Sequence, residues 1–144
     1  MTMRRWLAFT CALGLAACAA PPGPGSGTAA AAPPAPLAGT RWVGVVAGDP
    51  DARTLPRLEL SGSGRLAGFT GCNMMSGTWR EEGGEARFGP LIATKRFCVG
   101  PEGDVEKRVL AAFASGARGV REGDRFVIIA PGGARFEFSR AAAS

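Results

Sequence analysis

The sequence predicts one mainly antiparallel β domain with a single α-helix, preceded by an export signal and a tether. Short runs of alternating apolar and polar residues recur between residues 41 and 139, separated by Gly-rich turns, as is typical of antiparallel strands. Apolar residues at helical spacing occur in residues 104–115. We therefore expect a signal peptide (1–17), a tether (18–36), a domain (37–140) and a tail (141–144).

Residues 1–17 have the composition of a bacterial lipoprotein signal. A basic pair, Arg4 and Arg5, precedes an apolar run that ends at Leu-Ala-Ala-Cys, residues 15–18. The run of about 15 residues is shorter than the about 20 that a spanning helix needs, so we expect cleavage. An ordinary secretory signal cut at Ala17 or Ala20 is the alternative. The Leu-Ala-Ala-Cys segment resembles a lipobox, which implies acyl chains such as palmitate on Cys18 and a stable membrane anchor.

The tether contains neither a charged nor an aromatic residue between Ala19 and Pro36, so it cannot build a core. Its prolines stiffen it and its glycines loosen it, which gives a reach on the order of 30 to 50 Å. Ala19 follows the cysteine where an aspartate would favour the inner membrane, by resemblance to lipoprotein sorting rules. We therefore expect an outer-membrane lipoprotein that faces the periplasm of a Gram-negative host.

Composition excludes several classes of function. The 17 basic residues, less Arg4 and Arg5, stand against 12 acidic ones in the domain, and this scattered excess of three does not indicate nucleic-acid binding. The chain has no histidine, which excludes His-dependent serine or cysteine triads and removes the commonest metal ligand. We therefore expect no His-dependent catalysis, no metal and no cofactor.

The alternating runs predict a series of strands, joined in hairpins by the turns between them. Pro90 is expected to limit how far the strand before it can pair, because proline has no amide donor. The predicted strands are residues 41–47, 58–60, 66–69, 78–80, 86–88, 120–121, 126–130 and 135–139.

Two of these strands have distinctive patterns. The segment Phe-Val-Ile-Ile-Ala at 126–130 is apolar on both faces, which predicts a central strand covered on each side. In the last strand Phe136 and Phe138 alternate with Arg135 and Glu137, so we expect the two phenylalanines to point into the core.

The predicted helix presents one apolar face and has signals at both ends. Val105, Val109, Ala112 and Phe113 fall on that face, which we expect to lie on the sheet. Pro101 and Glu102 suit a helix start, and Asp104 is expected to cap the first turn. Gly116 fits the position just after the last turn.

Two cysteines remain in the folded domain once Cys11 leaves with the signal and Cys18 carries lipid. In an oxidising envelope this predicts one disulfide between Cys72 and Cys98. The flanking residues suit an irregular loop, because Gly71 tolerates a positive φ and the Asn73 side chain can satisfy backbone groups. The disulfide would hold a bend to a distant strand.

These cysteines lie in two motifs that carry a family resemblance. Gly71-Cys72-Asn73 with Ser76-Gly77, followed by Thr94 and Cys98 before a helix, resembles the META domain of HslJ-like proteins. The start, residues 37–42, and the closing Phe-x-Phe strand are also similar. The resemblance implies a small antiparallel β-barrel of lipocalin type with one helix and no established enzymatic activity. It also links the chain to the heat-shock response, novobiocin resistance and envelope upkeep.

Two alternatives to a structural role concern the motif residues. Cys72, Met74 and Met75 offer soft ligands of the kind that bind Cu(I), but a disulfide beside two core-filling methionines is the favoured interpretation. Lys95 and Arg96 are candidates to bind an acidic lipid or glycan, although a solvated strand end is favoured.

A third alternative is a hydrolase. Glu81, Glu82 and Glu85 supply carboxylates that a glycosidase would need as a placed pair. Their position around a turn favours a solvated hairpin tip.

For function we expect a monomeric, non-enzymatic binding or structural module that its lipid holds to the membrane. We expect it to bind another envelope protein, whose identity the sequence does not reveal. The alternative is a carrier of a lipid or hydrophobic small molecule inside the barrel. A pocket lined by Trp42, Phe69 and Phe126 would favour the carrier, and a filled core would argue against it.

Overall fold

The computed structural model of the protein describes residues 35–48 and 50–142, which belong to one compact unit. The expected signal peptide, Cys18 and the tether up to residue 34 lie outside the described residues. Among the residues that are described, no helix has the length and apolar character to cross a membrane.

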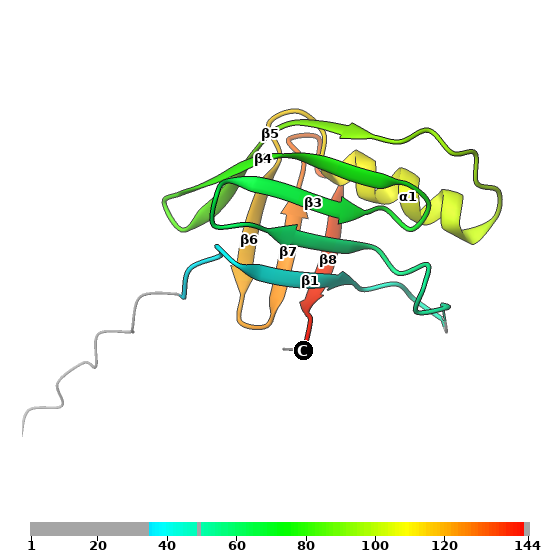
Figure 1. The fold of residues 1–144 in the computed structure, drawn as a ribbon, viewed down its shortest axis with the longest axis horizontal. Helices are drawn as coiled ribbons and strands as arrows, with labels where there is room; N and C mark the ends of the chain where they lie inside the picture. Colours follow the sequence, from blue (N-terminus) through cyan, green and yellow to red (C-terminus); the bar gives the residue numbers. More distant parts are fainter. Residues whose placement is uncertain (1–34, 49, 143–144) are drawn as a thin grey trace, which may run out of the picture. The chain divides into compact units, whose positions relative to one another are not determined.

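Eight strands form a closed antiparallel barrel in which each strand pairs with the next along the chain and β1 pairs with β8 (Figure 1). The barrel that the family resemblance implied is confirmed. The strands are β1 (Thr40–Gly44), β2 (Arg57–Leu60), β3 (Arg65–Phe69), β4 (Met74–Glu82), β5 (Glu85–Ala93), β6 (Arg118–Glu122), β7 (Arg125–Ile129) and β8 (Arg135–Arg140).

Strand β1 ends three residues earlier than predicted because its pairing partner β2 begins only at Arg57. Val43 pairs with Arg57, and the next partner residue is Pro56, which has no amide donor and offers only its carbonyl to the amide of Gly44. The apolar run continues to Ala47, but beyond this point the chain leaves the β1–β2 ladder.

The hairpin of β4 and β5 is much longer than predicted, and Pro90 lies inside it. Gly77 pairs with Leu91 and Trp79 pairs with Phe88, so Thr78 alone faces Gly89 and Pro90. This is a β-bulge, which places the proline where no ladder hydrogen bond is needed. The prediction that Pro90 limits the pairing was therefore wrong.

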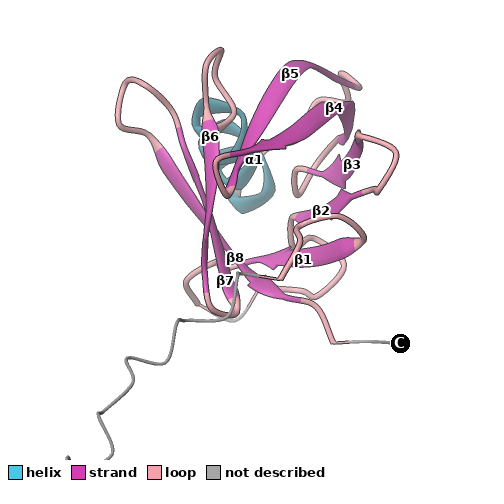
Figure 2. Ribbon diagram, turned by 90° about the vertical axis from the view of Figure 1, so that its left-hand side faces the viewer, coloured by secondary structure: helices cyan, strands magenta, loops and turns pink. Residues whose placement is uncertain are grey.

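The helix α1 (Pro101–Ala112) connects β5 to β6 and packs its apolar face into the barrel core (Figure 2). The four residues predicted for that face, Val105, Val109, Ala112 and Phe113, are all buried.

The helix starts where Pro101 and Glu102 predicted, but both predicted caps were wrong. The helix begins after Gly100, with Pro101 in its first turn, since a missing amide donor costs nothing there. Asp104 therefore lies within the first turn and pairs with Lys107 at 3.2 Å instead of capping. Phe113 is the C-cap, so Gly116, with φ +82°, lies in the turn beyond the C′ position.

Aromatic side chains fill the barrel interior. The rings of Trp42 and Phe126 stack with 5.1 Å between centroids, and Trp42 Nε1 donates a hydrogen bond to Thr40 Oγ1 at 2.8 Å. Phe136 and Phe138 point inward as predicted and lie 5.1 Å apart. Phe126, Val127 and Ile128 are buried in succession, which confirms that β7 is covered on both faces.

Candidate functional site

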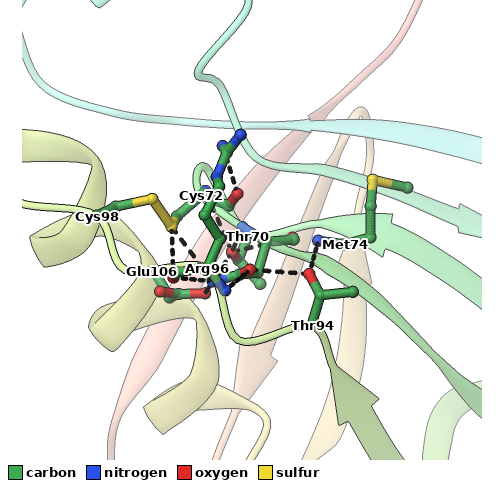
Figure 3. The surroundings of a disulfide bond; sticks show 8 residues. Thr70, Cys72, Met74, Thr94, Arg96, Cys98 and Glu106 are labelled. Atoms are coloured by element: carbon green, nitrogen blue, oxygen red, sulfur yellow. Dashed lines mark hydrogen bonds between the residues drawn. A yellow bond between two sulfur atoms is a disulfide. The ribbon is translucent and has the colours of Figure 1, made fainter.

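The Cys72–Cys98 disulfide links the turn after β3 to the segment between β5 and α1 (Figure 3). The two Cα atoms are 6.2 Å apart, and Cys72 is buried. The predicted pairing is confirmed. Seven residues around this disulfide form a connected cluster, which we call the latch: Thr70, Cys72, Asn73, Thr94, Arg96, Cys98 and Glu106.

The carboxamide of Asn73 is the centre of the latch. Its Oδ1 accepts hydrogen bonds from the Arg96 amide at 2.7 Å and from Thr94 Oγ1 at 2.8 Å. Its Nδ2 donates to the Arg96 carbonyl and to Glu106 Oε1, both at 2.9 Å. Because it binds both the amide and the carbonyl of Arg96, the side chain takes the place that a neighbouring strand would occupy.

Thr70 closes the turn beneath Asn73. Its hydroxyl lies 2.9 Å from Glu106 Oε1 and accepts a hydrogen bond from the Asn73 amide at 2.9 Å. Gly71 has φ +105°, and a side chain there would also approach the Thr54 carbonyl to 3.1 Å, so the turn requires glycine. Turn, loop and helix thus meet at one set of polar groups.

Arg96 and Thr94 bind the same turn from the other side. The Arg96 guanidinium donates to the Cys72 carbonyl at 2.8 Å, while Lys95 beside it is exposed to solvent. Thr94 Oγ1 accepts from the Met74 amide at 3.1 Å. In the described part of the chain, every buried side-chain nitrogen or oxygen has a hydrogen-bond partner. The polar groups of the latch are thus used to hold its segments together.

Gly77, the remaining motif residue, lies at the β-bulge. A Cβ at this position would fall 2.5 Å from Leu91 Cδ2 and 2.8 Å from the Pro90 carbonyl oxygen. Glycine is therefore needed for β4 to approach the bulged strand closely.

Glu106 was not predicted as a site residue. On a helical wheel it borders the apolar face next to Phe113, so its position gave a weak sign of partial burial. Its contacts with Thr70 and Asn73 span more than 30 residues, and periodicity within the helix carries no information on such pairings.

The soft-ligand cluster does not assemble. Met74 is 58% exposed, whereas Met75, the next residue on β4, is buried in the core, and the Cys72 sulfur is bonded to Cys98. Consecutive strand residues point to opposite faces, so these three side chains do not converge on one site.

Two of the three hairpin carboxylates form ion pairs with arginines, and Arg87 bridges Glu82 and Glu85. Glu85 pairs with Arg118 at 2.6 Å and with Arg87 at 3.0 Å, and Glu82 pairs with Arg80 at 3.3 Å. Glu81 accepts a hydrogen bond from the Leu37 amide at 3.4 Å. The three glutamates lie at the tip of the β4–β5 hairpin, as we expected from their position around a turn.

The interior pocket required by the carrier hypothesis is occupied by side chains. Trp42 and Phe126 stack on each other and are almost fully buried. Phe69 is only half-buried and lies under the Arg57 guanidinium, 5.3 Å from it. A depression of about 300 Å³ touches Trp42 and Phe69, but it opens on the outside of β1 to β3 and Phe126 does not line it.

Comparison with known proteins identifies the family. The family model of the META domain matches residues 35–143. The chain belongs to the META domain family. Two NMR structures are similar to this META domain, and at their low identity they show the fold alone. One, from Burkholderia xenovorans, is 24% identical with TM-score 0.57, covering 74% of this chain and 85% of that chain. The other is 19% identical with TM-score 0.56, covering 72% and 90%. Comparison with curated proteins gave no significant match.

One prediction concerns how α1 of this META domain approaches the latch. A Cβ at Gly103 would lie 2.5 Å from the Cys98 carbonyl oxygen. Alanine in a helix interior normally gains up to about 1 kcal/mol over glycine, but here the clash should reverse the sign and cost about 1 to 3 kcal/mol. Urea unfolding of Gly103→Ala measures this change, with the exposed helix position Ala111→Gly as the propensity control. A more stable Gly103→Ala variant would contradict the packing.

Proposed function

We propose that this protein is an envelope lipoprotein whose META domain works as a non-enzymatic binding or structural module. The observation that carries the proposal is the latch, in which the Cys72 and Asn73 motif side chains bind other parts of the domain. The aromatic side chains of the barrel interior likewise contact one another and fill the core. The motif of this chain is therefore best explained as a device that fixes the shape of a surface.

The anchoring part of the proposal rests on the sequence. Leu-Ala-Ala-Cys at residues 15–18 follows a short apolar run and precedes a Pro-rich segment without charge. Lipidation of Cys18 would hold the barrel within a few nanometres of a membrane, since the tether is at most about 50 Å long. We propose the periplasmic face of the outer membrane as that location.

Metabolic labelling tests the anchor. Cells that express the full chain with radiolabelled palmitate should yield a labelled protein in the outer-membrane fraction. Cys18→Ala should remove the label and release the protein from that fraction, because the acyl chains supply the membrane affinity. Cys11→Ala, which alters a cysteine inside the expected signal, is the matched control and should keep the label. Labelling that persists in Cys18→Ala would contradict the proposal.

We further propose a role in envelope or heat stress, or in tolerance to novobiocin. Its support is the likeness to HslJ-like proteins. A deletion strain complemented with wild type or Cys18→Ala should be compared for survival on novobiocin and after a heat shift. The wild type should restore survival and the unanchored variant should not. Equal survival of the deletion strain and its parent under both stresses would refute this role.

A further inference from the structure

The barrel is closed by few contacts between β5 and β6. The two strands share only the register pairs Ala86 with Gly119 and Arg87 with Arg118, although β5 continues to Ala93. Figure 2 shows α1 between β5 and β6. Beyond Arg87, the side of β5 turned away from β4 therefore has no strand neighbour among the described residues.

The direction of the backbone groups on this side follows from one hydrogen bond. The amide of Thr94 donates to the Met74 carbonyl at 3.0 Å, so Thr94 turns its backbone toward β4. Alternate residues of an antiparallel strand face the same neighbour, which places Ile92 with Thr94. Leu91 and Ala93 consequently point their amides and carbonyls away from β4.

The same alternation continues past the end of the strand because of the latch. Asn73 binds the amide and carbonyl of Arg96 and so acts as the neighbour on the β4 side. The residues on either side, Lys95 and Phe97, then turn outward, and Phe97 is 89% exposed. We call Leu91, Ala93, Lys95 and Phe97 the open edge. Within the described ranges, their main-chain groups have no partner in a turn, loop or side chain.

A groove meets the open edge at Leu91, the first of its four residues. It measures about 430 Å³ and lies between the bulged part of β5 and the C-terminal half of α1. Its apolar walls include Phe88, Leu91, Leu110 and Phe113, and Leu110 is 39% exposed. Farther along the edge, Lys95 has no acidic partner among the residues that the structure describes.

We propose that the open edge docks an extended segment of another polypeptide, which adds as a strand beside β5. Unpaired amides and carbonyls at alternate positions are the complement of a strand backbone. Apolar side chains at every second position of the segment would enter the groove against Leu110. An acidic residue at one end would meet Lys95. This assignment deepens the binding role proposed above and names the kind of partner that the role requires.

Other occupants fit these observations less well. A bilayer surface offers no regular array of donors and acceptors to a strand edge, and a helix has already used its own backbone groups. A second copy of this chain would have to pair edge with edge, and its open edge carries Lys95 but no acidic residue, so Lys95 would gain no opposite charge. An extended segment of a different protein can pair with the backbone of the open edge, place apolar side chains in the groove and bring an acidic residue to Lys95.

Amide hydrogen exchange on the full-length protein as cells process it, purified in mild detergent, tests the proposal. The probe is an acetylated heptapeptide of alternating threonine and valine that ends in glutamate. In the free protein, the open-edge amides should exchange at least about tenfold faster than those of Ile92 and Arg96. The peptide should slow the open-edge amides at least about tenfold at saturation. The same peptide N-methylated at every residue has no amide donors and should not slow them.

Two surface variants sharpen the test. Leu110→Ser should weaken peptide binding about three- to tenfold by removing an apolar wall of the groove. Val45→Ser changes an apolar residue of similar exposure outside the groove and should leave binding unchanged.

Three results would overturn the assignment: open-edge amides already protected in the dilute free protein, protection that rises with protein concentration alone, or equal protection by the N-methylated peptide. The second of these would identify a second copy as the occupant. The readout does not depend on where the protein resides, so it is separate from palmitate labelling at Cys18.

Discussion

A variant that carries both Cys72→Ala and Cys98→Ala should lose about 3.5 kcal/mol of unfolding free energy. The disulfide joins residues 26 positions apart, and the entropy of closing such a loop in the unfolded chain gives this magnitude. Small domains have about 5 to 15 kcal/mol in total, so the variant should be only marginally stable at 37 °C.

Urea unfolding under oxidising conditions measures this loss. Wild-type protein unfolded with a reductant is the internal control, because it should show nearly the same destabilisation without any substitution. A loss below about 1 kcal/mol in the double variant would show that the latch hydrogen bonds hold the turn without the covalent link.

The second large effect is expected at the centre of the barrel. Trp42→Ala should cost about 3 to 5 kcal/mol, because it removes a buried ring that stacks on Phe126 and leaves a cavity. Trp42→Phe keeps a ring and loses the hydrogen bond to Thr40 Oγ1, so it should cost less than half as much.

Thermal and urea unfolding of both Trp42 variants distinguish a filled interior from an adaptable pocket. If Trp42→Ala cost less than about 1 kcal/mol, the interior would have the spare room that a carrier needs. A filled barrel instead predicts that the alanine variant, and not the wild type, gains affinity for a small apolar probe such as indole, which fits the new cavity.

Much of the barrel could be predicted from the patterns of single strands. Phe136 and Phe138 point inward because a period of two fixes which side chains share a face, and the uninterrupted apolar run of β7 predicted its burial on both faces. The predicted apolar face of α1 is confirmed because the helical period of 3.6 residues fixes which side chains share a face. Patterns within one segment were sufficient wherever burial on one face decided the structure.

Predictions failed where a distant segment decides the local structure. The β-bulge at Pro90 depends on the register of β4, which the sequence of β5 does not contain. The start of α1, in contrast, is set locally by Gly100 and Pro101, and Asp104 therefore lies inside the first turn and does not cap it.

The latch was predictable in its covalent part and not in its hydrogen bonds. Cys72 and Cys98 were the only thiols left for the domain once the N-terminal cysteines were assigned. The contact of Asn73 with Arg96 joins segments more than 20 residues apart, and no local signal marks Arg96 as its partner. Gly71 has the positive φ that its residue type predicted, whereas the close approach of Leu91 and Pro90 to Gly77 had no sign in the sequence beyond the motif.

The latch and the open edge are parts of one arrangement. Asn73 and the disulfide hold residues 94–98 against the turn after β3, so the chain stays extended beyond the end of β5. This extension lengthens the edge that we propose as a docking site. The motif and the proposed docking site thereby share the same stretch of backbone. In this proposal the latch residues, whose polar groups are already hydrogen-bonded within the domain, contribute to binding by positioning that backbone.

The most direct test of this account is native-state hydrogen exchange at the amide of Arg96. If Asn73 replaces a strand neighbour, this amide should be strongly protected in the wild type, with an opening free energy close to that of global unfolding. In Asn73→Ala the protection of Arg96 should fall at least about a hundredfold more than that of the core amide of Phe126. An Arg96 amide that exchanges in the wild type as fast as in an unstructured peptide would contradict the account.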